Sequence, residues 1–273
     1  MNWQAIRAMI KRDLLAVMRS KGVVLPLILV PLILMVLLPA GFGYFTPVLN
    51  QLPDANMPDV DRLLEQMPPA MLDQFAGYNV DQFLIVFMLV FMFAPMFLVL
   101  PLMVASVVAA DSFAGEKERK TMEALIYTPT SDMELFIAKV LSAMIPSVIV
   151  SLAGFLLYGL SANLSAWPTM GEVFFPNAAW IVLVLWVSPA TAALGLGATV
   201  IVSSRVKSFQ EASQIAGVIV LPILLLMVAQ ISGLMYFGVL MTFLLGLAFW
   251  AIAAVLLWIG VRTFRRSEIM ARG

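Results

Sequence analysis

Residues 109–134 read AADSFAGEKERKTMEALIYTPTSDME, and they form the longest charged stretch of this 273-residue chain. Long uncharged runs precede and follow the segment. Only 12% of the residues are charged and 62% are hydrophobic, whereas soluble domains carry about 25% charged residues. The chain is therefore expected to cross a membrane several times. Residues 109–134 are then the main segment that can meet a soluble partner.

The hydrophobic runs predict an all-α polytopic membrane protein with six transmembrane helices. A run of about 20 apolar residues crosses the hydrocarbon core, and the uncharged stretch 212–261 is long enough for two crossings, with a turn near residues 230–233. Residues 161–177 are expected to form an outer loop, where Trp167 and Trp180 indicate an interfacial aromatic belt. The expected spans are residues 22–45, 82–110, 135–160, 178–202, 212–231 and 235–261.

Two segments lie outside these spans at the start of the chain. Residues 1–21 predict a basic helix with one apolar stripe, which is typical of a helix lying along a membrane surface; a simple positively charged anchor for the first span is the alternative. Residues 46–80 are read as an outer loop, either with short amphipathic helices or as a plain connection. Residues 22–273 are expected to form one six-span transmembrane domain.

The distribution of positive charge predicts the orientation. With six spans, 15 Lys and Arg residues, counting Lys139, fall on the side that holds both termini, residues 111–134 and residues 203–213, while Arg62 alone falls on the other. Cytoplasmic loops carry the excess of Lys and Arg. Both termini and the segment 111–134 are therefore expected in the cytoplasm, with the chain in the plasma membrane.

Composition excludes several kinds of chemistry. The chain has no cysteine or histidine, which removes thiol nucleophiles, Cys/His metal sites and histidine proton relays. It has no Walker loop for ATP, and its zero net charge indicates no preference for nucleic acid. Asp81 and Lys139 fall at opposite ends of their spans, so no buried acid–base pair is expected; Lys139 is expected to snorkel. We predict no catalytic, metal or cofactor site.

Small residues in the fourth predicted span indicate close helix packing. Within residues 192–199, Ala193 and Gly197 are four residues apart, as are Gly195 and Thr199. Such spacing allows neighbouring helices to approach closely. The pattern is interpreted as packing rather than as a substrate site.

The capping residues of the charged segment predict an elbow followed by a short helix. Asp111 or Ser112 is expected to cap a helix that contains Glu116 and Glu118 in its first turns. Ser131 or Asp132 is expected to cap the helix of the third span. An ordinary solvated loop is the alternative for the whole segment.

Between those caps, residues 122–127 predict the short helix itself. Thr121 can cap it and Glu123 lies in its first turn. Met122, Leu125 and Ile126 share one side, which gives the helix an apolar face suited to a groove on a soluble partner.

These residues carry a resemblance to a known family. Residues 110–131, with Glu134 and Lys139 after them, resemble the GEKE-R-x-T-x-E-x-L-x-x-x-P-x-S pattern of permease subunits of type-2 ATP-binding-cassette exporters, particularly the sodium- and drug-efflux-like branch. The pattern covers about 30 residues, and the six-span plan with an N-terminal interfacial helix extends the likeness over the chain.

The resemblance implies partners and roles. It implies two permease halves, as a homodimer or a heterodimer, in the lipid bilayer on two ATPase subunits that bind ATP and Mg²⁺. Residues 1–21, the charged segment and the loop 203–213 would contact the ATPase. The pathway would be lined by spans one, two and five. In the coupling segment, Glu116, Lys117, Glu118 and Arg119 would bias the elbow electrostatically, with Glu123 near them, while Met122, Leu125 and Ile126 would fill the groove.

The sequence thus predicts the membrane-spanning permease of an ATP-driven exporter, a transporter subunit rather than an enzyme. Two other functions stay open at this point. One is a channel or ion-coupled carrier that works without ATP, and the other is a membrane scaffold that recruits a soluble partner.

Overall fold

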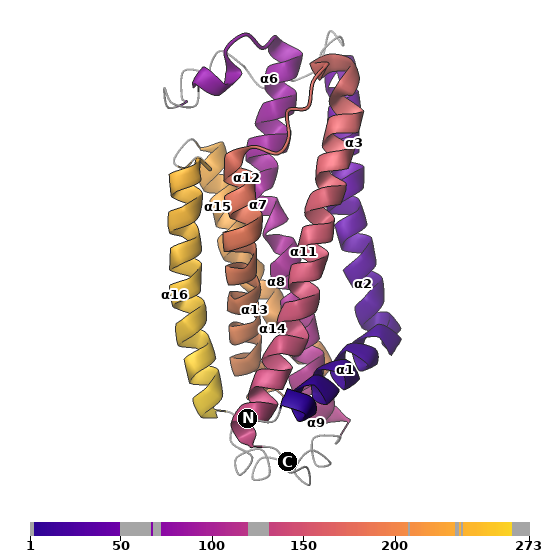
Figure 1. The fold of residues 1–273 in the computed structure, drawn as a ribbon, viewed down its shortest axis with the longest axis vertical. Coiled ribbons are helices and arrows are strands. Elements are labelled where there is room, and N and C mark those ends of the chain that lie inside the picture. Colours follow the sequence, from indigo (N-terminus) through magenta and orange to yellow (C-terminus); the bar gives the residue numbers. More distant parts are fainter. Residues whose placement is uncertain are drawn as a thin grey trace.

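The computed structural model describes residues 3–49, 67, 72–119, 131–206, 208–232, 235 and 237–263. Within these ranges the chain is helical and has no strand. Six helical stretches there are long and apolar enough to cross a membrane, and Figure 1 shows them as an elongated bundle. The predicted all-α, six-span membrane architecture is confirmed. The six stretches are Gly22–Val48, Val80–Glu118, Asp132–Met170, Ala178–Ser203, Phe209–Ile231 and Val239–Arg262.

Several spans contain more than one helical element, because short π-helical and 3₁₀ segments interrupt the regular α-helical bonding. Helix α1 (Trp3–Arg19) precedes the first span. The spans comprise α2 (Lys21–Leu32), η1 (Ile33–Leu37) and α3 (Leu38–Leu49); α6 (Val80–Val86), η3 (Phe87–Met92), α7 (Phe93–Phe97), α8 (Val99–Ala110), η4 (Asp111–Gly115) and α9 (Glu116–Glu118); α11 (Asp132–Met170); α12 (Ala178–Val182), η5 (Leu183–Val187) and α13 (Ser188–Ser203); α14 (Phe209–Gly217), η6 (Val218–Val220) and α15 (Leu221–Ile231); and α16 (Val239–Thr263), with the short turn η2 (Asp73–Phe75) before α6.

The third span is longer than expected. Helix α11 continues to Met170, so the prediction of an outer loop over residues 161–177 is wrong for its first ten residues. Ser161 Oγ donates a 2.8 Å hydrogen bond to the carbonyl of Val36, which ties this upper part of α11 to the first span. The helix ends where Gly171 adopts a positive φ of 69°, a common helix terminator that suits glycine.

The second span also continues past its expected end. Asp111 and Ser112 lie inside π-helix η4, so the prediction that one of them caps a new helix is wrong. The Asp111 carboxylate is bonded to Arg119 and does not compete for backbone N–H groups. By contrast, the predicted cap of the third span is confirmed, because Ser131 and Glu134 form a reciprocal capping box.

The bundle has two distinguishable ends. We call the charged end the one that holds α1, α9, the first turns of α11 and the turn between α13 and α14. In Figure 1 helix α1 crosses the lower part of α11 there and rises towards α2, while α3, α6 and the last turns of α11 lie at the opposite end. The second span is the most enclosed, with 78% of its most apolar window buried, against 22% for the first span and 17% for the fifth.

Small residues let α13 pack closely on two neighbours. A Cβ atom added to Gly195 would lie 3.0 Å from the Leu102 carbonyl oxygen of α8, and one added to Gly197 would lie 2.9 Å from Leu256 Cβ of α16. Thr199, the partner of Gly195 in the four-residue spacing, is fully buried. The predicted close-packing role of this small-residue run is confirmed.

Three successive carbonyl groups of η3 accept side-chain hydrogen bonds from three other helices. Tyr158 Oη of α11 donates to Leu89, Trp180 Nε1 of α12 donates to Val90, and Gln230 Nε2 of α15 donates to Phe91, at 2.5, 2.6 and 2.7 Å. We call this the carbonyl node.

The backbone of the second span explains why two of these carbonyls, those of Leu89 and Phe91, need donors. Pro95 has no N–H, so the Phe91 carbonyl loses its α-helical donor. The N–H of Phe93 bonds to Met88, five residues back, so it is diverted from Leu89. In a membrane interior a backbone group without a partner costs several kcal/mol, and the side chains of the carbonyl node supply the donors.

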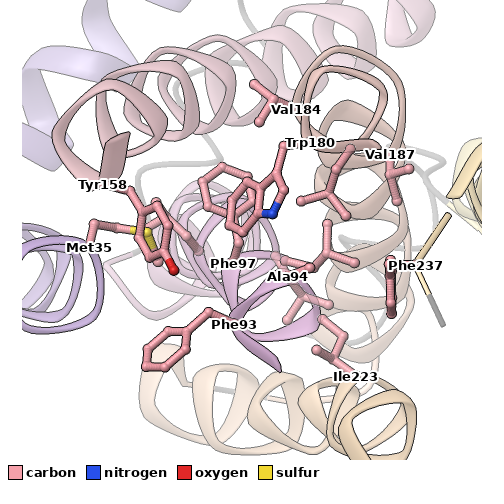
Figure 2. Packing of buried hydrophobic residues seen from close by; sticks show 14 of the residues in the cluster. Met35, Phe93, Ala94, Phe97, Tyr158, Trp180, Val184, Val187, Ile223 and Phe237 are labelled. Carbon is pink, nitrogen blue, oxygen red and sulfur yellow. The ribbon is translucent and has the colours of Figure 1, made fainter. Parts of the chain in front are cut away.

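Aromatic rings fill the space around the carbonyl node. The rings of Tyr158 and Trp180 stack with centroids 5.0 Å apart, and the edge of Phe97 meets Trp180 at 5.4 Å. Figure 2 shows these three side chains together, with Phe93 nearby. Trp180 is only 1% exposed, so its assignment to an interfacial belt is wrong, whereas Trp167 is half exposed.

The packing of α13 predicts a position-specific effect of a single methyl group. Gly195→Ala is expected to destabilise the bundle by about 1–3 kcal/mol, because the facing backbone cannot move away from the added carbon. Gly41→Ala, in α3, serves as the control, since its Cβ meets nothing within 4 Å. Unfolding of both variants in one detergent measures the difference, and equal stability of the two contradicts the close approach.

Candidate coupling site at the charged end

The carboxylate of Glu116 joins three helices at the charged end. Its Oε2 accepts a 2.5 Å bond from Lys139 Nζ of α11, and its Oε1 accepts a bond of the same length from Arg12 Nη2 of α1. The side chain comes from α9, at the end of the second span. Glu116 is 7% exposed. The two oxygens of one buried carboxylate therefore bind α1 and α11 to the end of the second span.

Lys139 is a buried cation rather than a snorkelling one. It is fully buried, its ammonium group also donates to the Ser112 carbonyl at 2.5 Å, and it lies 5.3 Å from the centre of the Phe113 ring. The expectation that Lys139 extends to the surface is wrong, and so is the expectation that no buried acid–base pair exists. A buried ammonium group is tolerated when it is paired and its protons are bonded.

Arg12 bridges two carboxylates. Besides its bond to Glu116, its Nη2 lies 2.8 Å from Oδ1 of Asp13, which is 4% exposed. Partial burial lowers the pKa of the Arg12 guanidinium, but the hydrogen bond to Asp13 and the charges of Glu116 and Asp13 outweigh burial, so the pKa is raised. Arg12 is therefore a permanent cation in this network.

A second ion pair lies across Gly115. Arg119 Nη1 bonds to Asp111 Oδ1 at 2.9 Å, and the hydrogen bond to Asp111 raises the pKa of the Arg119 guanidinium. A Cβ on Gly115 would lie 3.0 Å from Asp111 Oδ1 and 3.2 Å from Arg119 Nη1. Glycine at this position leaves room for the pair to close over the backbone.

Lys117 and Glu118 reach the turn between α13 and α14. Lys117 Nζ lies 3.4 Å from the Val206 carbonyl oxygen, after the end of α13, and Glu118 Oε2 accepts the N–H of Phe209, the first residue of α14, at 2.9 Å. A cation near a helix C-terminus and an anion at a helix N-terminus both complement the helix dipole. This pair therefore fixes the turn to the second span.

Together these contacts make a charge-balanced unit, which we call the charged hub. It is built from three carboxylates and three cations of the described chain, with Lys117 and Glu118 beside them: Asp13, Asp111, Glu116, Arg12, Arg119 and Lys139. It connects α1, the second span, α11 and the α13–α14 turn. Because buried charge pairs resist separation, the hub holds α1 and α11 to the end of the second span.

The predicted coupling residues fall into two groups in the structure. Glu116, Lys117, Glu118 and Arg119 all belong to the charged hub or lie beside it, whereas Met122, Glu123, Leu125 and Ile126 lie outside the described residues. Of the first four, Glu116 is directed inwards and Arg119 remains half exposed. Among the described residues, no cluster of side chains suited to a metal ion occurs.

Asp13, Arg12 and Lys139 were not predicted as partners of the motif. One signal was present, because Asp13 follows Ile6 and Met9 and precedes Val17 at helical spacing, and all four are buried. An acidic residue on the apolar stripe of an amphipathic helix requires a partner. Asp13 pairs with Arg12 on the same helix and accepts a hydrogen bond from Ser142 of α11, 129 residues away, which local spacing does not reveal.

The buried pair predicts strong coupling between two substitutions. Glu116→Gln is expected to lower stability by about 3–5 kcal/mol, since it leaves the buried Lys139 without its carboxylate. Lys139→Met is expected to lower stability by less, since Glu116 keeps its bond to Arg12. The double variant removes both charges and is expected to lose clearly less than the sum. Unfolding in one detergent measures this, with Arg205→Met as an exposed control at the same end. Additive losses exclude a direct interaction.

Comparison with known protein families matches residues 7–249 to the family described as ABC-2 family transporter protein. A comparison with curated proteins found no match. The matched range begins within α1 and ends within α16, so it includes the charged hub and reaches into all six spans. The chain therefore belongs to the ABC-2 transporter family, as a multi-pass membrane component of a transporter.

Proposed function

We propose that this chain is the permease subunit of an ATP-driven exporter, and that the charged hub passes motion from a separate ATPase to the spans. The observation that carries the proposal is the position of Glu116, whose carboxylate binds both α1 and α11 at the end of the second span. A force applied just after Arg119 would reach several elements at once. The chain itself has no Walker loop, so ATP and Mg²⁺ are assigned to the partner.

The segment that follows the hub is the proposed contact with the ATPase. Met122, Leu125 and Ile126 are assigned to a groove on the partner, and Glu123 to the helix start beside it. Lys117, Glu118 and Arg119 are assigned to the base of this segment. Glu116 transmits the force internally, because its carboxylate is already bonded within the bundle.

The proposed orientation places the charged end in the cytoplasm. The excess of Lys and Arg on that side supports it, as does the need of an ATPase for cytoplasmic ATP. Both termini are then cytoplasmic, and the chain lies in the plasma membrane. The end with α6 and the last turns of α11 faces outwards.

The transport pathway is proposed to lie between two permease halves. The inside of this bundle is occupied by stacked aromatic rings and the carbonyl node, which leaves a packed core rather than a passage. The first and fifth spans expose most of their apolar surface. A second half, either a copy of this chain or a related chain, would enclose the pathway against spans one, two and five.

An ion-coupled carrier is less compatible with the position of the buried charges. Such carriers place ionisable groups near the middle of the membrane. Lys139 lies only about 10 Å along α11 from its first residue, at 1.5 Å per residue, and Glu116 lies in the last turn of the second span. Their position at one end suits coupling to a cytoplasmic partner.

The proposal predicts that a substitution after the hub changes ATPase binding without changing the stability of the bundle. Leu125→Asp is expected to abolish co-purification of an ATPase in mild detergent, together with ATP hydrolysis by the complex, while the stability of the bundle is unchanged. Thr128→Asp adds the same charge outside the predicted apolar face and is the matched control. Pull-down with a tagged chain and an ATP hydrolysis assay measure both effects.

Two results contradict the proposal. If the unmodified chain brings down no ATPase in mild detergent, the ATP-driven function is excluded. If the complex that contains the Leu125→Asp variant hydrolyses ATP as fast as the complex that contains the Thr128→Asp control, residues 122–127 do not dock on the ATPase.

A further inference from the structure

A groove lies between α1 and α11 on the outside of the bundle. Its volume is about 360 Å³, within the range of small-ligand sites. The surface of the groove is almost wholly apolar, so Arg7 and Lys11 line it mainly with the methylene parts of their side chains. The side chains that line the groove are Arg7, Ile10, Lys11, Leu14, Leu15 and Met18 of α1 and Ile145 of α11.

The two cations of the groove are available to a ligand. Arg7 and Lys11 are both exposed, and neither forms an ion pair within the described part of the chain. They are four residues apart on one helix, which places their Cβ atoms about 5–6 Å apart. One phosphate group can therefore accept hydrogen bonds from both. Arg12, on the same helix, is in contrast bonded to Glu116 and Asp13.

The apolar part of the groove continues from these cations along α1. Leu15 and Met18 are 44% and 74% exposed, and Ile145 of α11 is 37% exposed. Helix α1 rises towards α2 (Figure 1), so its later turns lie farther from the first turns of α11 than its start does. Along α1 the groove therefore has its two cations, Arg7 and Lys11, on one side of the exposed apolar side chains Leu15 and Met18.

We infer that this groove binds an anionic glycerophospholipid. Arg7 and Lys11 hold its phosphate, and one acyl chain lies along Leu15, Met18 and Ile145. A zwitterionic lipid would bring its own ammonium group beside two cations, so an anionic headgroup is preferred. The inference does not depend on the ATPase, because it needs only a membrane surface at the level of α1.

Native mass spectrometry of the purified chain tests this inference directly. The chain is titrated with phosphatidylglycerol or with phosphatidylcholine of the same acyl chains, and bound lipids are counted. The unmodified chain is expected to bind phosphatidylglycerol more tightly. Each cation near an anionic headgroup contributes about fivefold in affinity, so Arg7→Gln with Lys11→Gln is expected to lose about 25-fold. Arg19→Gln, an exposed cation of α1 outside the groove, is the matched control and keeps the preference.

Two further measurements complete the experiment. One tests the apolar part of the groove, and the other tests whether the bound phosphate belongs to a lipid or to a free phosphate compound. Met18→Ser is expected to weaken binding of both lipids, while the soluble headgroup glycerol 3-phosphate is expected to bind far more weakly than the intact lipid. Equal binding of glycerol 3-phosphate overturns the lipid assignment in favour of a free phosphate. The inference is also overturned if both lipids bind equally, or if Arg19→Gln loses as much affinity as the double variant. A loss of dimers in the Arg7/Lys11 variant with unchanged lipid binding makes the groove a protein interface instead.

Discussion

The structure of the charged end depends on one buried carboxylate. Glu116 accepts a hydrogen bond from Lys139 on one oxygen and from Arg12 on the other. Without it, Lys139 would be a fully buried cation beside an aromatic ring and a carbonyl group, and Arg12 would have only Asp13. Desolvation makes such isolated charges expensive. The bonds of Glu116 therefore keep the end of the second span attached to both α1 and α11.

The first and fifth spans differ from the second span in how they are held in the bundle. The first and fifth spans bury only a small share of their residues inside the bundle and leave most of their apolar surface open. The charged hub and the carbonyl node instead use directional bonds, one set at the charged end and the other farther along the same second span. The most buried span thus carries both polar networks. A displacement that enters at Arg119 would pass along this span to the helices that donate to η3.

Much of the fold was predictable from the sequence, because apolar length and charge position dictate it. The six spans, the capping box at Ser131 and the close approach of Gly195 all follow from local patterns. The extension of α11 to Met170 does not follow from a local pattern. Ser161 is a residue type common in loops, and here its hydroxyl donates a hydrogen bond to the Val36 carbonyl of another helix. Residues 116–119 were predicted as part of one coupling segment, and the structure places them in or beside the charged hub, where their contacts with Arg12 and Lys139 depend on tertiary packing. The carbonyl node was missed for the same reason, although Pro95 already marks Phe91 as a carbonyl without a helical donor.

The most direct test of the charged hub is the width of a distance distribution across it. The chain has no cysteine, so Ala8→Cys on α1 and Gln210→Cys on α14 give two unique sites for spin labels, both exposed. Pulsed electron paramagnetic resonance in lipid nanodiscs then reports how firmly α1 is held relative to the α13–α14 turn. We expect a narrow distance distribution in the otherwise unmodified chain and a markedly broader one when Glu116→Gln is added. An equally narrow distribution in the Glu116→Gln background would show that this carboxylate does not hold the elements together.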